Sequence, residues 1–291
     1  MANLKEIRSR ITSVNSTRQI TSAMKMVSAA KLRRAQEAIT QMRPYALKLQ
    51  EILQNLTASL DVSENAFAKE RPVKRVLVIN VTSNRGLCGA FNNNVIKDSR
   101  AIMAEHPGAT VKVLSVGKKS FDFFKKTTHN PGVGYPAEPF RIYEDLNFGE
   151  ASIIAQAVMD KFTEEKVDKV YLVYNAFKNA AVQVLNREQF LPIVATAPEN
   201  TDSKVQADYI FEPSKEEIVT ELIPKSLKIQ LYKAILDSNA AEHGARMTAM
   251  HKATDNASEM LKDLKLTYNK ARQASITNEI LEIVAGAEAL S

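Results

Sequence analysis

The sequence predicts an α/β protein in which long N- and C-terminal helices pair as an antiparallel coiled coil, with a Rossmann-like α/β domain inserted between them. Three observations predict this fold. Both ends of the chain place apolar residues three and four positions apart, which is typical of amphipathic helices. The middle alternates β-branched and helical segments, which indicates a mostly parallel sheet. Alanines recur every fourth residue near the C-terminal end, forming a flat face that allows another helix to approach closely: Ala241, Ala245, Ala249, Ala253 and Ala257.

The N-terminal helix is expected to cover residues 4–60. Its apolar stripe opens with Leu4, Ile7, Ile11 and Val14, and it resumes after a six-residue step with Ile20, Met24, Val27 and Ala30. A second ridge of small residues is predicted to pack against the alanines: Ser9, Ser13, Thr17 and Thr21. Pro44 is expected to kink or interrupt the helix, and the stripe continues beyond it with Ala46, Leu49, Leu53, Leu56 and Leu60.

A polar connector at residues 61–72 separates this helix from the middle of the chain. Strands are expected at 73–82, 109–116, 167–175 and 181–192, and the first of these stretches is rich in β-branched residues. Helices are expected at 90–105, 118–127 and 148–166, and a loop rich in proline and glycine at 129–147. The predicted segments are therefore an N-terminal shaft helix (1–60), an α/β domain (73–212) and a C-terminal shaft helix (213–291).

The C-terminal helix has a well-marked start, since Ser214 followed by Glu217 forms the pattern of a capping box. Pro224 is expected to kink the helix and Gly244 to weaken it modestly. A later stripe follows three- and four-residue spacing through Leu264, Tyr268, Ala271, Ser275, Asn278 and Leu281. If the helix is continuous, some seventy residues at ~1.5 Å each span roughly 105 Å, which is longer than a compact domain requires.

The charge of the chain is concentrated at one end. The net charge is +6, but residues 1–60 alone hold ten Lys and Arg against three Glu, a charge of +7. Such a helix could face nucleic acid, acidic lipid or an acidic protein surface, or it could simply be a solvated face. No run of eighteen apolar residues occurs, and the charged N-terminus does not read as a secretory signal. The single cysteine, Cys88, fits a reducing compartment.

The sequence contains no recognisable active site. The turn after the first strand, SNRGLCG at 83–89, matches neither GxGxxG nor GxxxxGK[ST], so it lacks the glycines of a phosphate-binding loop. Cys88 has no CxxC partner, and a structural role in a tight turn is the simpler interpretation. The four histidines have no metal-ligand spacing, and no serine lies in GxSxG.

Three longer stretches carry a family resemblance. They are MANLKEIRSRITSVNSTRQITSAMKMVSAAKLRRAQ, SNRGLCGAFN, and ARMTAMHKATDN with LTYNKARQASITNEILEIVAGAEAL. They resemble the γ subunit of F-type ATP synthase, near-continuously over both terminal helices and more loosely through the middle. In that family the turn usually reads Ser/Thr-Asp-Arg-Gly-Leu-Cys-Gly, whereas this chain has Asn84 in place of the acid.

The resemblance implies a rotor in a central stalk that couples ion flow to ATP synthesis or hydrolysis. The implied partners are a hexamer of three α and three β subunits, the ε subunit and a ring of c subunits, with no nucleic acid. The nucleotide chemistry would belong to those partners, so no catalytic residue, cofactor or metal is expected here. The implied location is peripheral, on the cytoplasmic side of the bacterial plasma membrane.

The resemblance also assigns residues to contacts. The upper contact with β-subunit loops maps onto Arg272, Gln273 and Thr277. The surface pressed by an acidic β lever maps onto Met24, Lys25, Lys31, Arg33 and Arg34. The foot on the c ring and ε maps onto Arg43, Pro44, Tyr45, Tyr209 and Glu212. The structural turn comprises Arg85, Gly86, Cys88 and Gly89.

Two other classes of protein fit parts of the sequence. A coiled-coil scaffold with an inserted α/β module fits the periodicity equally well, and only the family motifs argue against it. An α/β enzyme fits the middle of the chain but leaves the two long ends unexplained.

Overall fold

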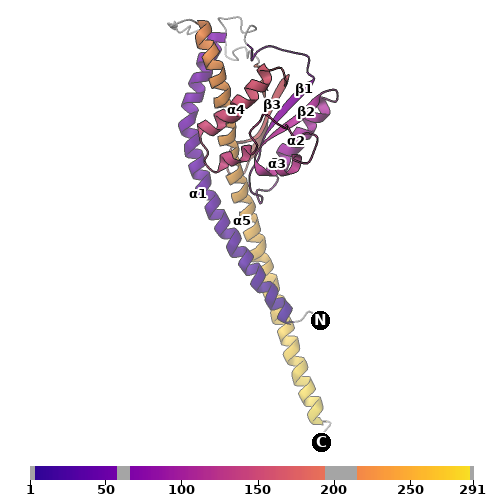
Figure 1. Ribbon diagram of the computed structural model, residues 1–291. Helices are drawn as coiled ribbons and strands as arrows, with labels where there is room; N and C mark the ends of the chain where they lie inside the picture. Colours follow the sequence, from indigo (N-terminus) through magenta and orange to yellow (C-terminus); the bar gives the residue numbers. More distant parts are fainter. Residues whose placement is uncertain (1–3, 58–65, 194–214, 289–291) are drawn as a thin grey trace. The chain divides into compact units, whose positions relative to one another are not determined.

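The computed structural model describes residues 4–57, 66–193 and 215–288, and it has the predicted α/β architecture (Figure 1). A four-stranded sheet lies in the sequence between two long helices, α1 (Leu4–Thr57) and α5 (Lys215–Glu288). The chain forms two compact units, one of residues 1–29 with 246–291 and one of residues 30–245. Each long helix therefore contributes residues to both units. The division into three segments at residues 60, 73 and 213 stays a prediction.

The sheet has the strand order β2-β1-β3-β4. Its strands are β1 (Arg75–Val81), β2 (Thr110–Val116), β3 (Lys169–Phe177) and β4 (Gln183–Leu191). β1 runs parallel to both β2 and β3, and β4 pairs antiparallel with β3. The prediction of a mostly parallel sheet is confirmed, and each predicted strand lies within two residues of its observed bounds.

The side chains of β1 alternate between two apolar layers, as strand geometry requires. Leu77 and Ile79 face a layer built by α4 (Phe148–Thr163) and the N-terminal part of α5. Val76 and Val78 face the opposite layer, which contains residues of α2 (Phe91–Glu105) and α3 (Lys118–Phe124). The sheet is therefore covered by helices on both faces, which suits strands that are apolar on both sides.

The N-terminal part of α5 is a component of the α/β core. Its side chains there pack with the sheet and α4, and all are 2% exposed or less: Ile223, Leu227, Leu231, Ala234 and Ile235. The sequence predicted this stretch as part of a shaft outside the domain. The helix is in fact shared, because its first turns cover the sheet.

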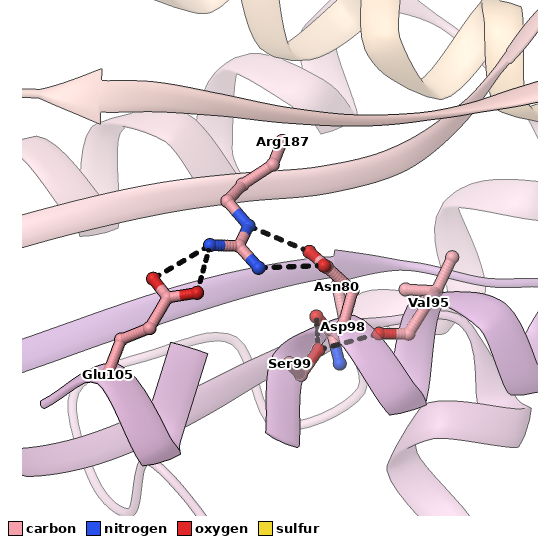
Figure 2. A network of polar contacts seen from close by, with 6 residues as sticks. All are labelled: Asn80, Val95, Asp98, Ser99, Glu105 and Arg187. Atoms are coloured by element: carbon pink, nitrogen blue, oxygen red, sulfur yellow. Dashed lines mark hydrogen bonds and ion pairs between the residues drawn. The ribbon is translucent and has the colours of Figure 1, made fainter. Parts of the chain in front are cut away.

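Arg187 of β4 fixes the edge of the sheet to α2 (Figure 2). Its guanidinium donates to both carboxylate oxygens of Asp98, at 3.0 and 2.8 Å, and to both of Glu105, at 2.7 and 2.8 Å. These hydrogen bonds raise the pKa of Arg187 above its usual value. Two bidentate contacts from one planar group define the distance and angle between strand and helix.

The same helix is anchored by a buried polar chain beneath it. Ser99 Oγ donates to Asn80 Oδ1 at 2.6 Å, and Asn80 Nδ2 donates to Ser120 Oγ at 3.2 Å (Figure 2 shows the first contact). Ser120 also lies 2.9 Å from Ser115 Oγ. All four side chains are buried, so their polar atoms need these partners.

In the first unit, residues of α1 that alternate three and four apart are buried or half-buried: Ile7, Ile11, Val14, Arg18, Thr21, Lys25 and Ser28. The expected stutter is wrong, since Ile20 and Val27 are 60% and 57% exposed. Thr21 and Ser28 can be buried because their hydroxyls donate to backbone carbonyls of the preceding turn, Arg18 O and Met24 O. These residues form the α1 side of a helix–helix contact, called the seam below. The seam follows an unbroken heptad pattern that includes polar positions.

The matching positions of α5 follow the same spacing: Met250, Thr254, Ala257, Leu261, Leu264, Tyr268, Ala271 and Ser275. The hydroxyls of Thr254 and Thr21 lie 2.8 Å apart, so the two helices meet at these positions. The expected stripe is confirmed from Leu264 to Ser275, whereas Asn278 and Leu281 are exposed. Beyond the N-terminus of α1, α5 continues without a partner helix in this unit (Figure 1).

The alanine ridge does not act as one seam. Ala257 is buried at the seam and Ala249 and Ala253 are half-buried, but Ala241 and Ala245 pack with Cys88 and other residues of the α/β domain. Of the ridge expected on α1, Thr21 is buried and contacts Thr254 of α5, whereas Ser9, Ser13 and Thr17 are exposed, so the ridge as a whole does not face α5.

The prolines do not end their helices. α1 runs through Pro44 and α5 runs through Pro224, so Pro44 does not interrupt its helix, and the kinks expected at the two prolines stay predictions. α5 begins at Lys215, directly after the expected cap residue Ser214, which lies outside the described residues. The loop expected at 129–147 contains a short 3₁₀ helix, η2 (Pro139–Tyr143).

Candidate functional surfaces

The turn between β1 and α2 contains the predicted structural residues Arg85, Gly86, Cys88 and Gly89. Gly89 has φ 61°, a left-handed conformation that glycine adopts without strain. Leu87 also has a positive φ, 64°, and is 64% exposed. Nothing in the sequence indicates that conformation, because leucine rarely adopts it.

The interior of this turn is a hydrogen-bonded cluster around Cys88, whose side chain is buried. Asn92 Nδ2 lies 3.2 Å from Cys88 Sγ and 2.8 Å from Ser83 Oγ, and Asn92 Oδ1 accepts from Ser83 N at 2.8 Å. Cys88 also packs with Phe91 and with Ala241 of α5. These contacts give the cysteine a structural place in the turn.

Asn84, which stands where the resembled motif has an acid, bridges two neighbouring segments. Its Oδ1 accepts from the backbone N–H of Lys118 at 2.9 Å, and its Nδ2 donates to Phe140 O at 2.9 Å. An ionised aspartate has no hydrogen to donate to a carbonyl. The amide therefore makes a contact that the family's acid cannot make in this geometry.

The carboxyl ends of β1 and β3 mark the place where open α/β sheets bind nucleotides. Here that place is filled by the chain itself. Asn175 of β3 is 2% exposed and donates to Phe91 O at 3.0 Å, and Thr82 Oγ1 accepts from Ser120 N at 3.1 Å. A Cβ at Gly117 would overlap the carbonyl oxygen of Thr82.

Among residues 4–57, 66–193 and 215–288, no group of three or more His, Cys, Asp or Glu is placed to hold a metal ion. Within the same described ranges, no helix combines the length and apolar character needed to cross a bilayer.

The predicted upper contact lies near the end of α5. Arg272, Gln273 and Thr277 are exposed, and Thr277 Oγ1 donates to Gln273 O at 2.9 Å. The helix then presents exposed apolar side chains on several faces, each at least 47% exposed: Ile276, Ile280, Leu281, Ile283 and Val284. Met24 and Lys25, predicted for the lever contact, are half-buried in the same unit.

The other predicted lever residues belong to the second unit. Lys31, Arg33 and Arg34 are exposed, and Arg33 Nε donates to Glu37 Oε1 at 3.1 Å. Of the predicted foot, Arg43, Pro44 and Tyr45 are exposed on α1, whereas Tyr209 and Glu212 lie outside the described residues. Which partners these residues contact stays a prediction.

One contact on α5 escaped the sequence prediction. The β3–β4 turn lies against Gly244, where a Cβ would be 3.2 Å from Ala180 O and 3.5 Å from the Phe177 ring. The sequence predicts only that Gly244 weakens the helix, because a sequence alone does not show which residue approaches a glycine.

A family model described as ATP synthase matches residues 3–290. The ATP synthase gamma chain of Flavobacterium psychrophilum is 60% identical over 292 residues, covering 100% of this chain and 99% of the relative. That of Flavobacterium johnsoniae is 60% identical over 293 residues and covers 100% of both chains.

The chain belongs to the ATP synthase gamma chain family. Solved structures agree in fold. A chain of the Euglena gracilis mitochondrial ATP synthase has a TM-score of 0.63 at 20% identity, covering 99% of this chain and 94% of that one. A central-stalk chain of the Tetrahymena thermophila enzyme has a TM-score of 0.55 at 24% identity, covering 80% and 99%.

Proposed function

We propose that this chain is the rotor of the central stalk in an F-type ATP synthase, coupling ion flow to ATP synthesis or hydrolysis by rotation. The observation that carries the proposal is the full-length match to gamma chains at 60% identity. Its partners are the α and β subunits of the catalytic hexamer, the ε subunit and the c ring. It is a peripheral protein at the cytoplasmic face of the bacterial plasma membrane.

α5 offers a direct route for torque. Residues 223–235 of this helix are locked into the α/β core, and the same helix continues without a break to residue 288. A force on the α/β domain therefore acts on the helix itself rather than on a flexible linker. The heptad seam with α1 adds stiffness to the distal part, because each seam residue is held by the partner helix.

The exposed end of α5 suits a surface that must slide. Apolar contacts are non-directional, so Ile276, Ile280 and Ile283 can meet successive neighbours at similar free energy. Hydrogen bonds are directional, so Arg272 and Gln273 would hold the rotor at defined angles. Rotation then biases each catalytic site in turn, as ligands bias a conformational equilibrium.

The chain itself is proposed to be non-catalytic. The place where an open α/β sheet would hold a nucleotide is occupied by the Asn175–Phe91 contact. The turn after β1 is closed around Cys88 by Asn92 and Ser83 rather than open to a phosphate. The phosphoryl chemistry would therefore belong to the α and β subunits.

The proposal is tested by replacing Arg272 and Gln273 together with alanine in the assembled complex. Losing a charge-assisted hydrogen bond is worth roughly 1.5–3 kcal/mol, so ATP turnover should change by about ten-fold or more although neither residue touches nucleotide. ATP hydrolysis and ATP-driven ion pumping in membranes are the measurements. Lys126→Ala, which removes an exposed cation of the α/β domain, is the control. Normal assembly with unchanged hydrolysis and pumping in the double variant would leave the chain a passive scaffold.

A further inference from the structure

A cavity of about 300 Å³ lies in the second unit between α1, α5 and the segment around η2. Such a volume is at the lower end of the range for small-molecule sites. Its apolar lining includes Leu146, which is half-buried, and Leu236, which is 3% exposed. Ala35 and Ala38 add small apolar side chains, and each polar residue of the lining can donate a hydrogen bond: Lys31, Arg34, Tyr143, Tyr232, Asn239 and His243.

The charge at this cavity is positive on one side. Lys31 and Arg34 are one helical turn apart on α1, so their side chains share a face. In the described part of the chain neither cation has an ion pair or a hydrogen bond, whereas Arg33 between them pairs with Glu37 at 3.1 Å. Among the described residues, no Asp or Glu lines the cavity.

The opposite wall contributes neutral donors. Burial raises the pKa of Tyr143 well above its usual value, and the charge of Glu242 raises it further. Burial also raises the pKa of Tyr232. Both phenols therefore stay protonated at neutral pH. Glu242 is itself buried and is not part of the lining.

We infer that this cavity is a binding site for a small organic anion, a phosphate or carboxylate that carries a compact aromatic or aliphatic body. Lys31 and Arg34 would bind the anionic group, since a guanidinium and an ammonium both suit phosphate and carboxylate oxygens. The body would lie between Leu236 and the tyrosine rings. This inference is independent of rotation, because it concerns binding to the chain alone.

Phenyl phosphate is the probe, and fluorine NMR of full-length chain labelled with 3-fluorotyrosine is the measurement. The chain has 8 tyrosines, and saturable binding should shift the signals of Tyr143 and Tyr232, assigned by Tyr→Phe variants. Inorganic phosphate, which lacks a body, and phenol, which lacks a charge, should each bind at least ~10-fold more weakly. Vesicles of phosphatidylglycerol, titrated in parallel, distinguish a lipid headgroup from a free molecule as the source of the anion.

Lys31→Gln and Arg34→Gln should each weaken phenyl phosphate binding about 5- to 20-fold, the range for one charged contact at a partly exposed site. Arg33→Gln is the matched control, because it removes the same charge from the same helix without altering the lining. The inference is overturned if Arg33→Gln weakens binding as much as the other two. It is equally overturned if neither phenyl phosphate nor the vesicles shift the Tyr143 and Tyr232 signals.

Discussion

At the scale of single residues, the most sensitive position is Gly117, which follows β2. Its φ is 143° and a Cβ there would overlap Thr82. Gly117→Ala should therefore destabilise the chain by about 3 kcal/mol or more, because both the backbone conformation and a buried contact are lost. Urea unfolding measures the effect. Gly108→Ala, where nothing lies within 4 Å of a Cβ, is the control and should change the unfolding free energy by less than about 1 kcal/mol.

Asp168 is expected to make the stability of the fold depend on pH. Burial opposes its charge, but hydrogen bonds from the Arg75 side chain and from the backbone N–H groups of Lys74 and Arg75 lower the pKa of Asp168. A lowered carboxylate pKa stabilises the fold above the unfolded value of about 3.9, and this stabilisation is lost as the pH falls through the folded pKa.

Asp168→Asn should lower the free energy of unfolding by about 1–2 kcal/mol at pH 7. The value is modest because Arg75 is half-exposed, so solvent screens its ion pair with Asp168. The difference between variant and wild type should shrink as the pH is lowered below about 4. Urea titrations at several pH values measure it. A gap that stays constant from pH 7 to pH 3 contradicts the role assigned to this carboxylate.

At the scale of secondary structure, the α1–α5 seam is the feature to test. Ala257 is 7% exposed at a seam position. Ala257→Leu should overpack the two helices and cost about 1–3 kcal/mol, measured by thermal unfolding. Ala274→Leu places the same side chain at an exposed position of the same helix. Equal unfolding temperatures for the two variants would show that Ala257 does not lie in a close helix–helix contact.

The sequence predicted the existence and nearly the bounds of these elements, since β-branched strands and long periodic helices have strong local patterns. It misplaced the seam of α1, because Ile20 and Val27 fit an apolar stripe while Thr21 and Ser28 do not. Burial of a hydroxyl depends on a backbone acceptor that only the folded helix provides. Ala241 was misassigned for a related reason, since its partner Cys88 is distant in the sequence.

At the scale of the whole molecule, the α/β domain keeps the layers of a nucleotide-binding fold but fills the usual site with Asn175 and Phe91. The isolated chain should therefore neither hydrolyse ATP nor bind it in calorimetry at sub-millimolar concentration, whereas the assembled complex should do both. Tight saturable binding of ATP to the chain alone would contradict this expectation and favour the interpretation of the domain as an α/β enzyme. The contact residues assigned by resemblance remain predictions, because their partners are other chains.

The membership of α5 in the α/β core has a consequence for synthesis on the ribosome. All four strands have been made once residue 191 emerges, yet one face of the sheet still lacks its cover from residues 223–235. Leu77, Ile79 and Leu172 are fully buried in a cluster that contains side chains of both α4 and this part of α5. A nascent chain therefore lacks part of the cover of this apolar face throughout the translation of at least thirty further residues, a window in which a chaperone that recognises exposed apolar surface can engage it.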